Sequence, residues 1–250
     1  MKENPVFNYL RRESLPLKFC PGCGHGIILG AVARAIDELK LDMDKMVFVS
    51  GIGCAGWISS PNLNADTLHT THGRAIPAAT GVKTARPDLN VVVISGDGDL
   101  ATIGGNHLIH AARRNIPMTV ICANNSIYGM TGGQTSGTTP KGIKTVTDPQ
   151  GNIYDGFDLA PLVKAAGAAY VARYTTFHVR ELIRAVKTAL KGNGFSFIEA
   201  VSQCPTHYGK SVGQQAAEML TFFKEKSVTI KRAKEMSPDE LAGKITIGEF

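Results

Sequence analysis

The sequence predicts an α/β fold, a doubly wound and mostly parallel sheet with helices on both faces. Short apolar runs alternate with segments of helical periodicity along most of the 250 residues, a pattern typical of parallel sheets. Several apolar runs end in Gly, Asp, Asn or Cys, and ligands bind at the carboxyl ends of parallel strands. A chain of this length buries a sizeable core. We therefore expect one α/β domain over residues 1–210, then a helix and tail over 211–250 that pack on the same domain or on a partner subunit.

The expected elements follow from apolar periodicity and from the Gly and Pro residues that interrupt it. Residues 1–19 show no such periodicity and are expected to be irregular. Strands are expected at residues 46–50, 91–94, 118–123, 169–172 and 195–201. Helices are expected at residues 27–39, 75–85, 100–114, 159–166 and 178–190. The alternation in the tail, residues 244–250, predicts an edge strand or an arm onto a partner.

One long segment, residues 131–158, has no convincing periodicity and is rich in Gly, Thr and Pro. Loops of this length inside a compact domain are usually functional or disordered. Because the segment starts in Gly132-Gly133-Gln134, we expect a folded loop over a bound cofactor.

Composition indicates a globular protein of the cytoplasm. Apolar residues make up 43% of the chain and charged residues 19%, as in soluble domains. The longest aliphatic runs are far shorter than the ~18 residues that a membrane span needs. The first residues, 1–12, lack the apolar core of a signal peptide. We expect no membrane association.

The net charge of +6 raises the question of a nucleic-acid partner. The basic residues are scattered, apart from a C-terminal cluster of Lys224, Lys226, Lys231, Arg232 and Lys234. No nucleic-acid motif accompanies them, and aromatic residues are only 7% of the chain. An acidic protein partner fits a basic surface better. Steep salt dependence of generic duplex binding would support the nucleic-acid alternative.

Two apolar runs end in residues suited to a metal and a phosphate. Residues 91–94 lead into Gly96-Asp97-Gly98-Asp99, and residues 118–123 lead into Asn124-Asn125. Asp97 and Asn125 supply hard oxygens, and Mg²⁺ takes about six of these, shared with phosphates and water. Gly96 and Gly98 let backbone amides approach an anion closely. The sequence therefore predicts a magnesium–diphosphate site.

The five cysteines point to metal or redox chemistry, because disulfides are rare in cytosolic proteins. Cys20 and Cys23 form a Cys-Pro-Gly-Cys turn, whereas Cys54 and Cys204 each follow a strand. Zinc, a redox pair and an iron–sulfur cluster all remain open for the first two. Zinc usually pairs two such turns, and a redox pair usually starts a helix, whereas clusters accept dispersed thiolates. Cys122 lies inside a predicted buried strand and is expected to be structural.

His72 and Arg74 precede the helix expected at residues 75–85. An imidazole and a guanidinium at that place suit a phosphate or a substrate carboxylate, with a structural role as the alternative. His25 lies beside the thiols, where a hydrogen bond tunes a redox centre. The pairs His69/His72 and His107/His110 have metal-compatible spacing, but such pairs more often serve packing or capping.

Six motifs spread over residues 20–205 resemble the β subunit of the 2-oxoacid:ferredoxin oxidoreductases: CPGCGH, GIGC, THGRA, GDGD, NN with YGMTGGQ, and QCP. The resemblance implies a thiamine diphosphate-binding fold. It implies Mg²⁺ ligands at Asp97, Asn125 and the backbone carbonyl of Ile127. It implies a [4Fe–4S] cluster on Cys20, Cys23, Cys54 and Cys204. It implies cofactor contacts at Ile52, Gly53, Cys54, Ala55, Gly96, Gly98, Asp99, Gly129, Met130 and Thr131, with His72, Arg74 and Met130 as catalytic candidates.

By the same resemblance, the enzyme decarboxylates a 2-oxoacid oxidatively with coenzyme A and reduces ferredoxin. The motifs are most similar to those of 2-oxoglutarate-specific β subunits, with 2-oxoisovalerate and pyruvate enzymes as alternatives. Pyruvate enzymes carry Asn where Met130 stands, and some broad-specificity relatives carry a substrate-contacting lysine where Gly132 stands. The group that binds the distal carboxylate is therefore not identified by motif. A more distant alternative is a redox-silent thiamine decarboxylase subunit whose cysteines bind zinc or nothing.

A glutamate that activates the aminopyrimidine of thiamine is missing from the motifs of this chain. In the family that residue comes from the α subunit, so the chain is expected to hold half an active site. The expected partners are the α subunit, ferredoxin, a 2-oxoacid and coenzyme A. Ferredoxin-like gamma and delta subunits are left open.

Overall fold

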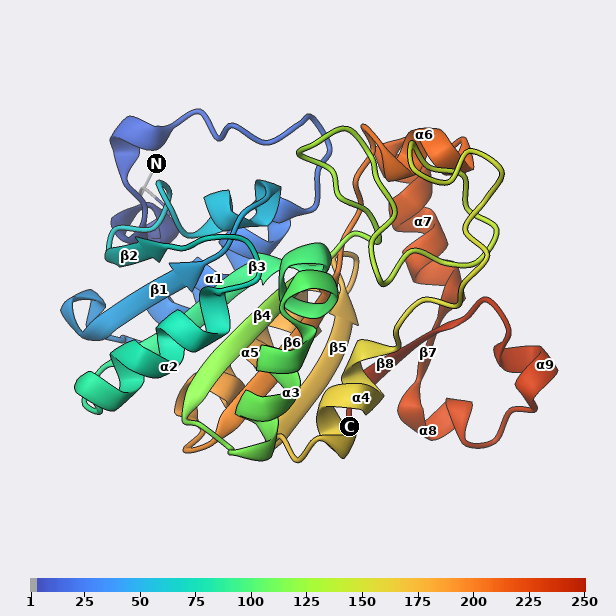
Figure 1. The fold of residues 1–250 in the computed structure, drawn as a ribbon. Coiled ribbons are helices and arrows are strands. Elements are labelled where there is room, and N and C mark those ends of the chain that lie inside the picture. The colour runs from blue at the N-terminus through green and yellow to red at the C-terminus, as the bar shows by residue number, and fades with distance from the viewer. Residues whose placement is uncertain (1–3) are drawn as a thin grey trace.

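The computed structural model describes residues 4–250, which form one eight-stranded sheet in the order β2-β1-β3-β4-β6-β5-β8-β7. The six strands from β2 to β5 run parallel, β8 runs antiparallel to β5, and β7 is parallel to β8. The strands are β1 (Met46–Ser50), β2 (Asp66–His69), β3 (Asn90–Gly96), β4 (Met118–Asn124), β5 (Tyr170–Thr175), β6 (Phe195–Val201), β7 (Ser227–Thr229) and β8 (Ile245–Glu249). The predicted doubly wound, mostly parallel sheet is confirmed (Figure 1).

Helices cover both faces of this sheet. One buried cluster joins the strands to α1 and α5, and a second joins them to α2, α3 and α4. The helices are α1 (His25–Leu39), α2 (Ala75–Ala85), α3 (Gly105–Arg113), α4 (Leu159–Ala165), α5 (Val179–Lys191), α6 (Tyr208–Val212), α7 (Ala216–Lys226), α8 (Ile230–Ala233) and α9 (Pro238–Leu241). Short 3-10 turns lie at Pro5–Tyr9, Arg12–Ser14, Met43–Lys45 and Cys54–Ile58.

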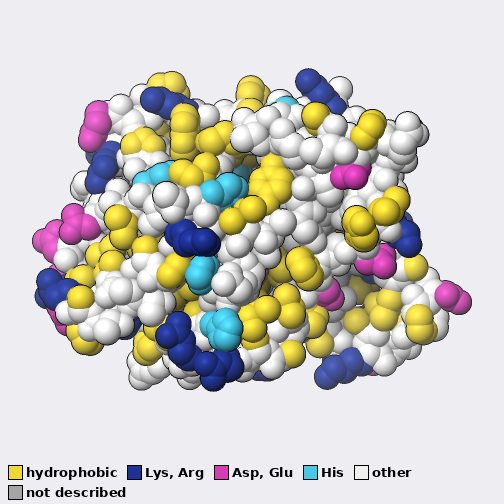
Figure 2. Space-filling view, viewed as in Figure 1, with side chains coloured by type: hydrophobic (Ala, Val, Ile, Leu, Met, Phe, Trp, Pro, Cys, Tyr) yellow, Lys and Arg dark blue, Asp and Glu magenta, His cyan; other side chains and the backbone are white. Residues whose placement is uncertain are grey.

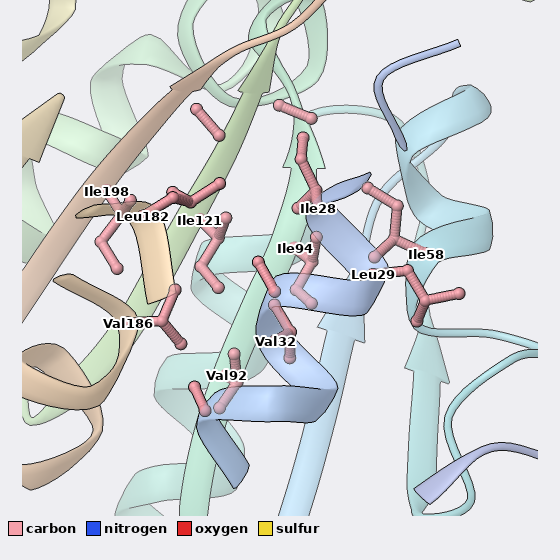
Figure 3. Packing of buried hydrophobic residues seen from close by; sticks show 14 of the residues in the cluster. Ile28, Leu29, Val32, Ile58, Val92, Ile94, Ile121, Leu182, Val186 and Ile198 are labelled. Atoms are coloured by element: carbon pink, nitrogen blue, oxygen red, sulfur yellow. The ribbon is translucent and has the colours of Figure 1, made fainter. Parts of the chain in front are cut away.

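The central strands are apolar on both sides because both of their faces are buried. In β3, Val92 and Ile94 pack in the cluster with α1 and α5, while Val91 and Val93 pack in the cluster with α2 and α3. Figure 3 shows Val92 and Ile94 among side chains from both covering helices on their side. Burying each such side chain contributes about 1.5–3 kcal/mol. The two-residue alternation therefore fixes the register of the strand and, with it, the position of the Gly96–Asp99 turn.

The helix predicted at residues 100–114 is interrupted in the structure. A π-helical turn spans Gly98–Ile103, and α3 begins only at Gly105. Consecutive glycines at 104 and 105 are poor helix formers. A side chain at Gly104 would also meet the carbonyl of Asp99 at 2.7 Å. The wide turn that results keeps Asp99 buried beside the strand ends.

Strand β2 was not predicted. Its sequence, Asp-Thr-Leu-His, has no alternation of apolar and polar residues that would indicate a strand. This agrees with its burial, since only Thr67 is partly buried. It forms because its backbone pairs in parallel register with β1, Ser50 lying opposite His69. This pairing carries the chain to His72 at the same edge of the sheet as the other strand ends.

The tail forms a strand, as one of the two predictions had it, but not at the edge of the sheet, because β7 pairs beyond it. Strand β8 pairs with β5 through Arg173 and Gly248, and the amide of Phe250 donates to the carbonyl of Val171 at 2.8 Å. The Arg173 guanidinium lies 5.3 Å from the centroid of the Phe250 ring. These contacts join residues after 211 to the main sheet.

Within residues 4–250, no helix combines the length and the apolar character needed to cross a lipid bilayer.

Candidate functional site

A pocket lies where β1, β3 and β4 end. The residues that line it are His25, Ile52, Gly53, Cys54, Ala55, His72, Gly96, Asp97, Gly98, Asp99, Asn125, Ile127, Tyr128, Gly129, Met130 and Thr131. All the residues expected to hold magnesium or contact the cofactor are in this set. Parallel strands bring segments far apart in the sequence to one edge, which is why these motifs meet.

Arg74 is the one catalytic candidate outside the lining. Its guanidinium Nη1 lies 3.2 Å from Nε2 of His107 in α3, and its side chain is exposed. Arg74 directly precedes α2, and its contact with α3 places it on the outer rim. His72 thus lines the pocket and Arg74 does not, and a catalytic role for Arg74 stays a prediction.

Asp97 is buried at 1% exposure between the two strand ends. Its Oδ2 accepts hydrogen bonds from Ser136 at 2.6 Å and from Thr138 at 2.5 Å. Its Oδ1 accepts only a longer bond, 3.3 Å, from the backbone amide of Asn125. Burial raises the pKa of this carboxyl, and the two hydroxyl donors oppose that rise. A nearby cation would favour the ionised form further.

The turn after β4 contributes further oxygen-bearing residues to the pocket that Asp97 lines. Asn125 Oδ1 accepts the amide of Ile127 at 3.3 Å, and Ser126 takes a positive φ of 60° that reverses the chain. Ile127 is 3% exposed, and no donor within residues 4–250 binds its backbone carbonyl. A buried carbonyl without a donor is costly unless something else binds it. Oxygens of Asp97, Asn125 and Ile127 thus fit a hard cation.

Gly96 and Gly98, at and just after the end of β3, are glycines for different structural reasons. A side chain at Gly98 would lie 2.2 Å from Cε1 of Tyr128, so glycine is required there for the ring to pack. The Tyr128 hydroxyl donates to the carbonyl of Gly98 at 3.2 Å. At Gly96 a Cβ would meet only Ala55 at 3.8 Å, and that space opens toward the pocket. Gly96 therefore leaves room for a ligand, whereas Gly98 serves packing within the chain.

The Asp99 carboxylate does not point free into the pocket. It accepts hydrogen bonds from the amides of Ile52 at 3.1 Å and Gly73 at 2.7 Å, and from Ser95 Oγ at 2.9 Å. A side chain at Gly51 would come within 2.1 Å of Asp99 Oδ2. The contact of Asp99 with a diphosphate was expected from the motif. In the structure its carboxylate joins the loops at Ile52 and Gly73 to the end of β3, and the contact with a diphosphate stays a prediction.

Four cysteines line a second cavity of about 270 Å³: Cys20, Cys23, Cys54 and Cys204. A Cβ at Gly129 would lie 3.9 Å from Sγ of Cys54 and 3.6 Å from Sγ of Cys204, so this position is in van der Waals reach of both sulfurs. Burial raises the pKa of the Cys23 thiol to about 12, and the neighbouring cysteines add to the rise. Cys122 is fully buried within β4 and does not line the cavity.

The four thiols surround this cavity without converging on one point. Among the residues that the structure describes, no three His, Cys, Asp or Glu side chains are grouped closely enough to hold a single metal ion. A polynuclear cluster needs its thiolates spread around it. Four thiols that line one cavity fit such a cluster.

The two cavities share a wall. His25, Cys54, Asn125, Gly129 and Met130 line both of them. Burial lowers the pKa of His25 to about 4, so its imidazole is neutral near pH 7. Its Nδ1 lies 3.4 Å from the hydroxyl of Ser202. A group bound in the first cavity would thus be separated from one in the second by single side chains.

Three residues of the site were missed by sequence reasoning: Tyr128, Ser136 and Thr138. Tyr128 stands within a motif that was used, but its ring had no assigned role. Ser136 and Thr138 lie in the long aperiodic segment, whose folded state was expected from its Gly-rich start. The structure describes this segment as an ordered loop. Its polar composition was the only available signal for contacts with Asp97.

Similarity to known proteins agrees with this geometry. Residues 51–200 match the family described as "Thiamine pyrophosphate enzyme, C-terminal TPP binding domain", which defines the class. The chain is 56% identical to the 2-oxoglutarate synthase subunit KorB of Methanothermobacter thermautotrophicus, over 100% of this chain and 87% of that protein. It is 41% identical to 2-oxoacid:ferredoxin oxidoreductase 2, subunit beta, of Aeropyrum pernix, over 76% of this chain and 62% of that protein.

A solved structure is also similar, that of 2-oxoglutarate:ferredoxin oxidoreductase from Magnetococcus marinus with 2-oxoglutarate, coenzyme A and succinyl-CoA bound. The TM-score is 0.87 and the identity 33%, over 100% of this chain and 85% of that chain. The chain belongs to the family of 2-oxoacid:ferredoxin oxidoreductase beta subunits, as the motifs predicted. It is thus part of a multi-subunit oxidoreductase, and an alpha subunit is the implied partner.

Proposed function

We propose that the chain is the beta subunit of an enzyme that converts 2-oxoglutarate and coenzyme A to succinyl-CoA and CO₂. The two electrons released pass one at a time to ferredoxin. The observation that carries the proposal is the wall shared by the strand-end pocket and the four-thiol cavity. The names of the relatives at 56% and 33% identity support 2-oxoglutarate as the substrate. 2-Oxoisovalerate and pyruvate are the alternatives that the substrate test below separates.

The strand-end pocket would hold thiamine diphosphate through Mg²⁺. Asp97, Asn125 and the carbonyl of Ile127 supply metal ligands, and the open space at Gly96 admits the diphosphate. Gly53, with a φ of 127°, turns the chain so that Ile52 and Cys54 both line the pocket. When bound, thiamine diphosphate supplies the electron sink for decarboxylation.

The four-thiol cavity would hold a [4Fe–4S] cluster on Cys20, Cys23, Cys54 and Cys204. Because the Cys23 thiol is protonated at neutral pH, cluster binding must displace its proton. The neutral His25 imidazole lies in the shared wall, where it keeps positive charge away from the route between the two centres. The cluster supplies one-electron acceptance next to the thiamine site.

His72 is the proposed residue for proton handling or carboxylate binding at the reacting substrate. It lines the pocket, and its side chain is 35% exposed. Met130, 45% exposed, would bound the substrate on the side facing the thiols. Arg74, on the rim, is proposed to meet a carboxylate only at the entrance, of the substrate or of the partner subunit.

The pocket is half of a complete active site. Its enclosed volume of about 80 Å³ is well below the 300–1,000 Å³ usual for a ligand of cofactor size. Among residues 4–250, no glutamate lines it. Apolar residues at its mouth stay exposed, Ile52 at 39% and Met130 at 45%. Figure 2 shows histidine side chains (cyan) beside apolar ones (yellow) near the middle of this face. We infer that the alpha subunit covers this surface and completes the cofactor site.

Ferredoxin is the proposed acceptor, and the cytoplasm the proposed location. Residues 1–210 would then form the catalytic domain, and residues 211–250 a basic appendage joined to it through β8. The test is anaerobic co-purification of the chain with its alpha subunit, followed by viologen reduction with a panel of 2-oxoacids. Activity confined to 2-oxoglutarate is expected. Preference for pyruvate or 2-oxoisovalerate would reassign the substrate, and colourless protein without iron would remove the oxidoreductase mechanism.

A further inference from the structure

We propose that Ser136 and Thr138 are positioning residues that make Asp97 a monodentate ligand and so select Mg²⁺ over larger cations. The inference rests on the proposed function, because it takes Asp97 to be a metal ligand. It concerns two residues of the long loop that no motif singled out.

The hydroxyls of Ser136 and Thr138 both donate to one oxygen of the Asp97 carboxylate. Ser136 Oγ and Thr138 Oγ1 lie 2.6 Å and 2.5 Å from Asp97 Oδ2. Both residues are buried, at 3% and 6% exposure, so water does not compete for them. Each hydroxyl has a single proton. Thr138 Oγ1 also lies 3.1 Å from Asn124 Oδ1, but the closer, charged acceptor takes the proton.

The other oxygen of Asp97 is left for a metal. Oδ1 has one long contact, 3.3 Å from the amide of Asn125, which leaves a lone pair available. Asn125 and Ile127 line the same pocket. Mg²⁺ demands a near-ideal octahedron at about 2.1 Å, whereas Ca²⁺ accepts 6–8 oxygens and bidentate carboxylates. Both lone-pair sites of Oδ2 accept hydrogen bonds, so a bidentate contact would require at least one of these bonds to break.

The loop around these hydroxyls is built to hold them. The Gly137 amide donates to Thr102 Oγ1 at 2.8 Å. A side chain at Gly137 would meet Thr102 at 2.9 Å and Phe157 at 3.0 Å. Thr139 Oγ1 donates to the carbonyl of Ser126 at 2.7 Å, which joins the same loop to the Asn125 turn. Ser136 and Thr138 thus sit on a backbone fixed from both sides.

The experiment compares metal binding in the full chain co-purified with its alpha subunit. The variants are Thr138→Val, which keeps the shape and removes the hydroxyl, Ser136→Ala, and the double variant. Thr138→Ser restores the hydroxyl and is the conservative rescue. Thr147→Val is the matched control: its hydroxyl accepts the amide of Thr135 at 3.0 Å in the same loop but does not touch Asp97. Mg²⁺ and Ca²⁺ are titrated by calorimetry with saturating thiamine diphosphate, and Mn²⁺ binding is followed by electron paramagnetic resonance.

We expect the double variant to bind Mg²⁺ roughly 10–100-fold more weakly, the usual effect of losing a residue that orients a metal ligand. Ca²⁺ affinity should fall less or rise, so the preference for Mg²⁺ narrows. Thr138→Ser and Thr147→Val should behave as wild type. Unchanged Mg²⁺ affinity, or equal losses for both cations, overturns the inference and leaves the proposed function standing. A wild-type complex that binds neither Mg²⁺ nor thiamine diphosphate overturns both.

Discussion

Nδ1 of His72 lies 2.6 Å from Oδ1 of Asp99, at the mouth of the strand-end pocket. The carboxylate thereby fixes the ring and occupies one of its two nitrogens. Nε2 remains available for chemistry in the pocket, and the Tyr128 ring meets the imidazole edge-on at 5.8 Å between centroids. Asp99 thus acts through His72 and the loop amides, whereas Asp97 is the proposed metal ligand.

Asp99→Asn should lower both stability and activity. The Ile52 amide, the Gly73 amide and His72 Nδ1 all meet Asp99 Oδ1, and Ser95 Oγ donates to Oδ2. Asparagine has a neutral oxygen in place of the first and an amide nitrogen in place of the second, so three donors lose a charged acceptor and Ser95 loses its acceptor. We expect a loss of roughly 2–4 kcal/mol in the free energy of unfolding, measured by urea denaturation. Asp88→Asn, at an exposed carboxylate, is the control and should stay within about 0.5 kcal/mol of wild type. Equal stability of the two variants would contradict the role given to Asp99.

Asp97→Ala should abolish retention of thiamine diphosphate while the protein stays folded. Asp97 is the only carboxylate among the three proposed ligands, so its loss removes the negative charge that holds the metal. Removal of Mg²⁺ with a chelator should release the cofactor from the wild type in the same way. Cofactor content after gel filtration measures both. Full retention by Asp97→Ala would show that the metal is held elsewhere.

Cys20, Cys23, Cys54 and Cys204 should each be required for iron, and Cys122 should not. The first four line one cavity, whereas Cys122 is fully buried in β4. Single serine replacements are compared by iron and sulfide content after anaerobic purification. Cys122→Ser buries a hydroxyl and should cost about 1–3 kcal/mol of stability but keep its iron. An intact cluster in Cys204→Ser, or a lost one in Cys122→Ser with a folded chain, would reverse the assignment.

The buried Arg173–Glu199 pair should make a large, local contribution to stability. Arg173 Nε lies 2.7 Å from Glu199 Oε2, and Asn124 donates to Glu199 Oε1 at 2.8 Å. Glu199→Gln removes the buried negative charge beside the guanidinium, which keeps only its ion pair with the exposed carboxylate of Asp158, and should cost up to about 3–5 kcal/mol. Replacing both members, as Arg173→Met with Glu199→Leu, should cost less than the single change because no buried charge is left alone. Chemical denaturation of the three proteins decides it, and a double variant less stable than the single one would contradict this account.

The features of the fold and the site that could be predicted from the sequence are those marked by a local pattern of residues. Asp97 and Asn125 were predicted because each follows an apolar run that forms a central strand. Ser136 and Thr138 were not, since they reach Asp97 from 39 and 41 residues away through a loop without periodicity. Strand β2 escaped prediction because its side chains are mostly exposed and backbone pairing alone defines it. The contact of Arg74 with His107 likewise depends on how α2 and α3 pack, which no motif encodes.

The chain alone should be inactive and should work only with its alpha subunit, passing electrons to an acidic ferredoxin. The strand-end pocket encloses about 80 Å³ and, within residues 4–250, has no lining glutamate, so thiamine diphosphate would be only partly covered.

Helix α7 starts against the Cys20–Cys23 turn, where Ala216 lies 2.5 Å from the Cβ position of Gly22. It leads to the exposed basic cluster of Lys224, Lys226, Lys231, Arg232 and Lys234, which would attract an acidic carrier toward the thiol cavity. Salt at 0.15 M screens charges beyond about 8 Å, so the rate of ferredoxin reduction should fall as salt is added.

The measurement is anaerobic ferredoxin reduction with 2-oxoglutarate and coenzyme A, with and without the alpha subunit, over a salt series. Lys224→Glu and Lys226→Glu, each made alone, should weaken the salt dependence, with Lys141→Glu on the long loop as the control that changes the net charge by the same amount. Full activity of the lone chain would refute the half-site, and a rate independent of salt would refute the steering role of the basic cluster.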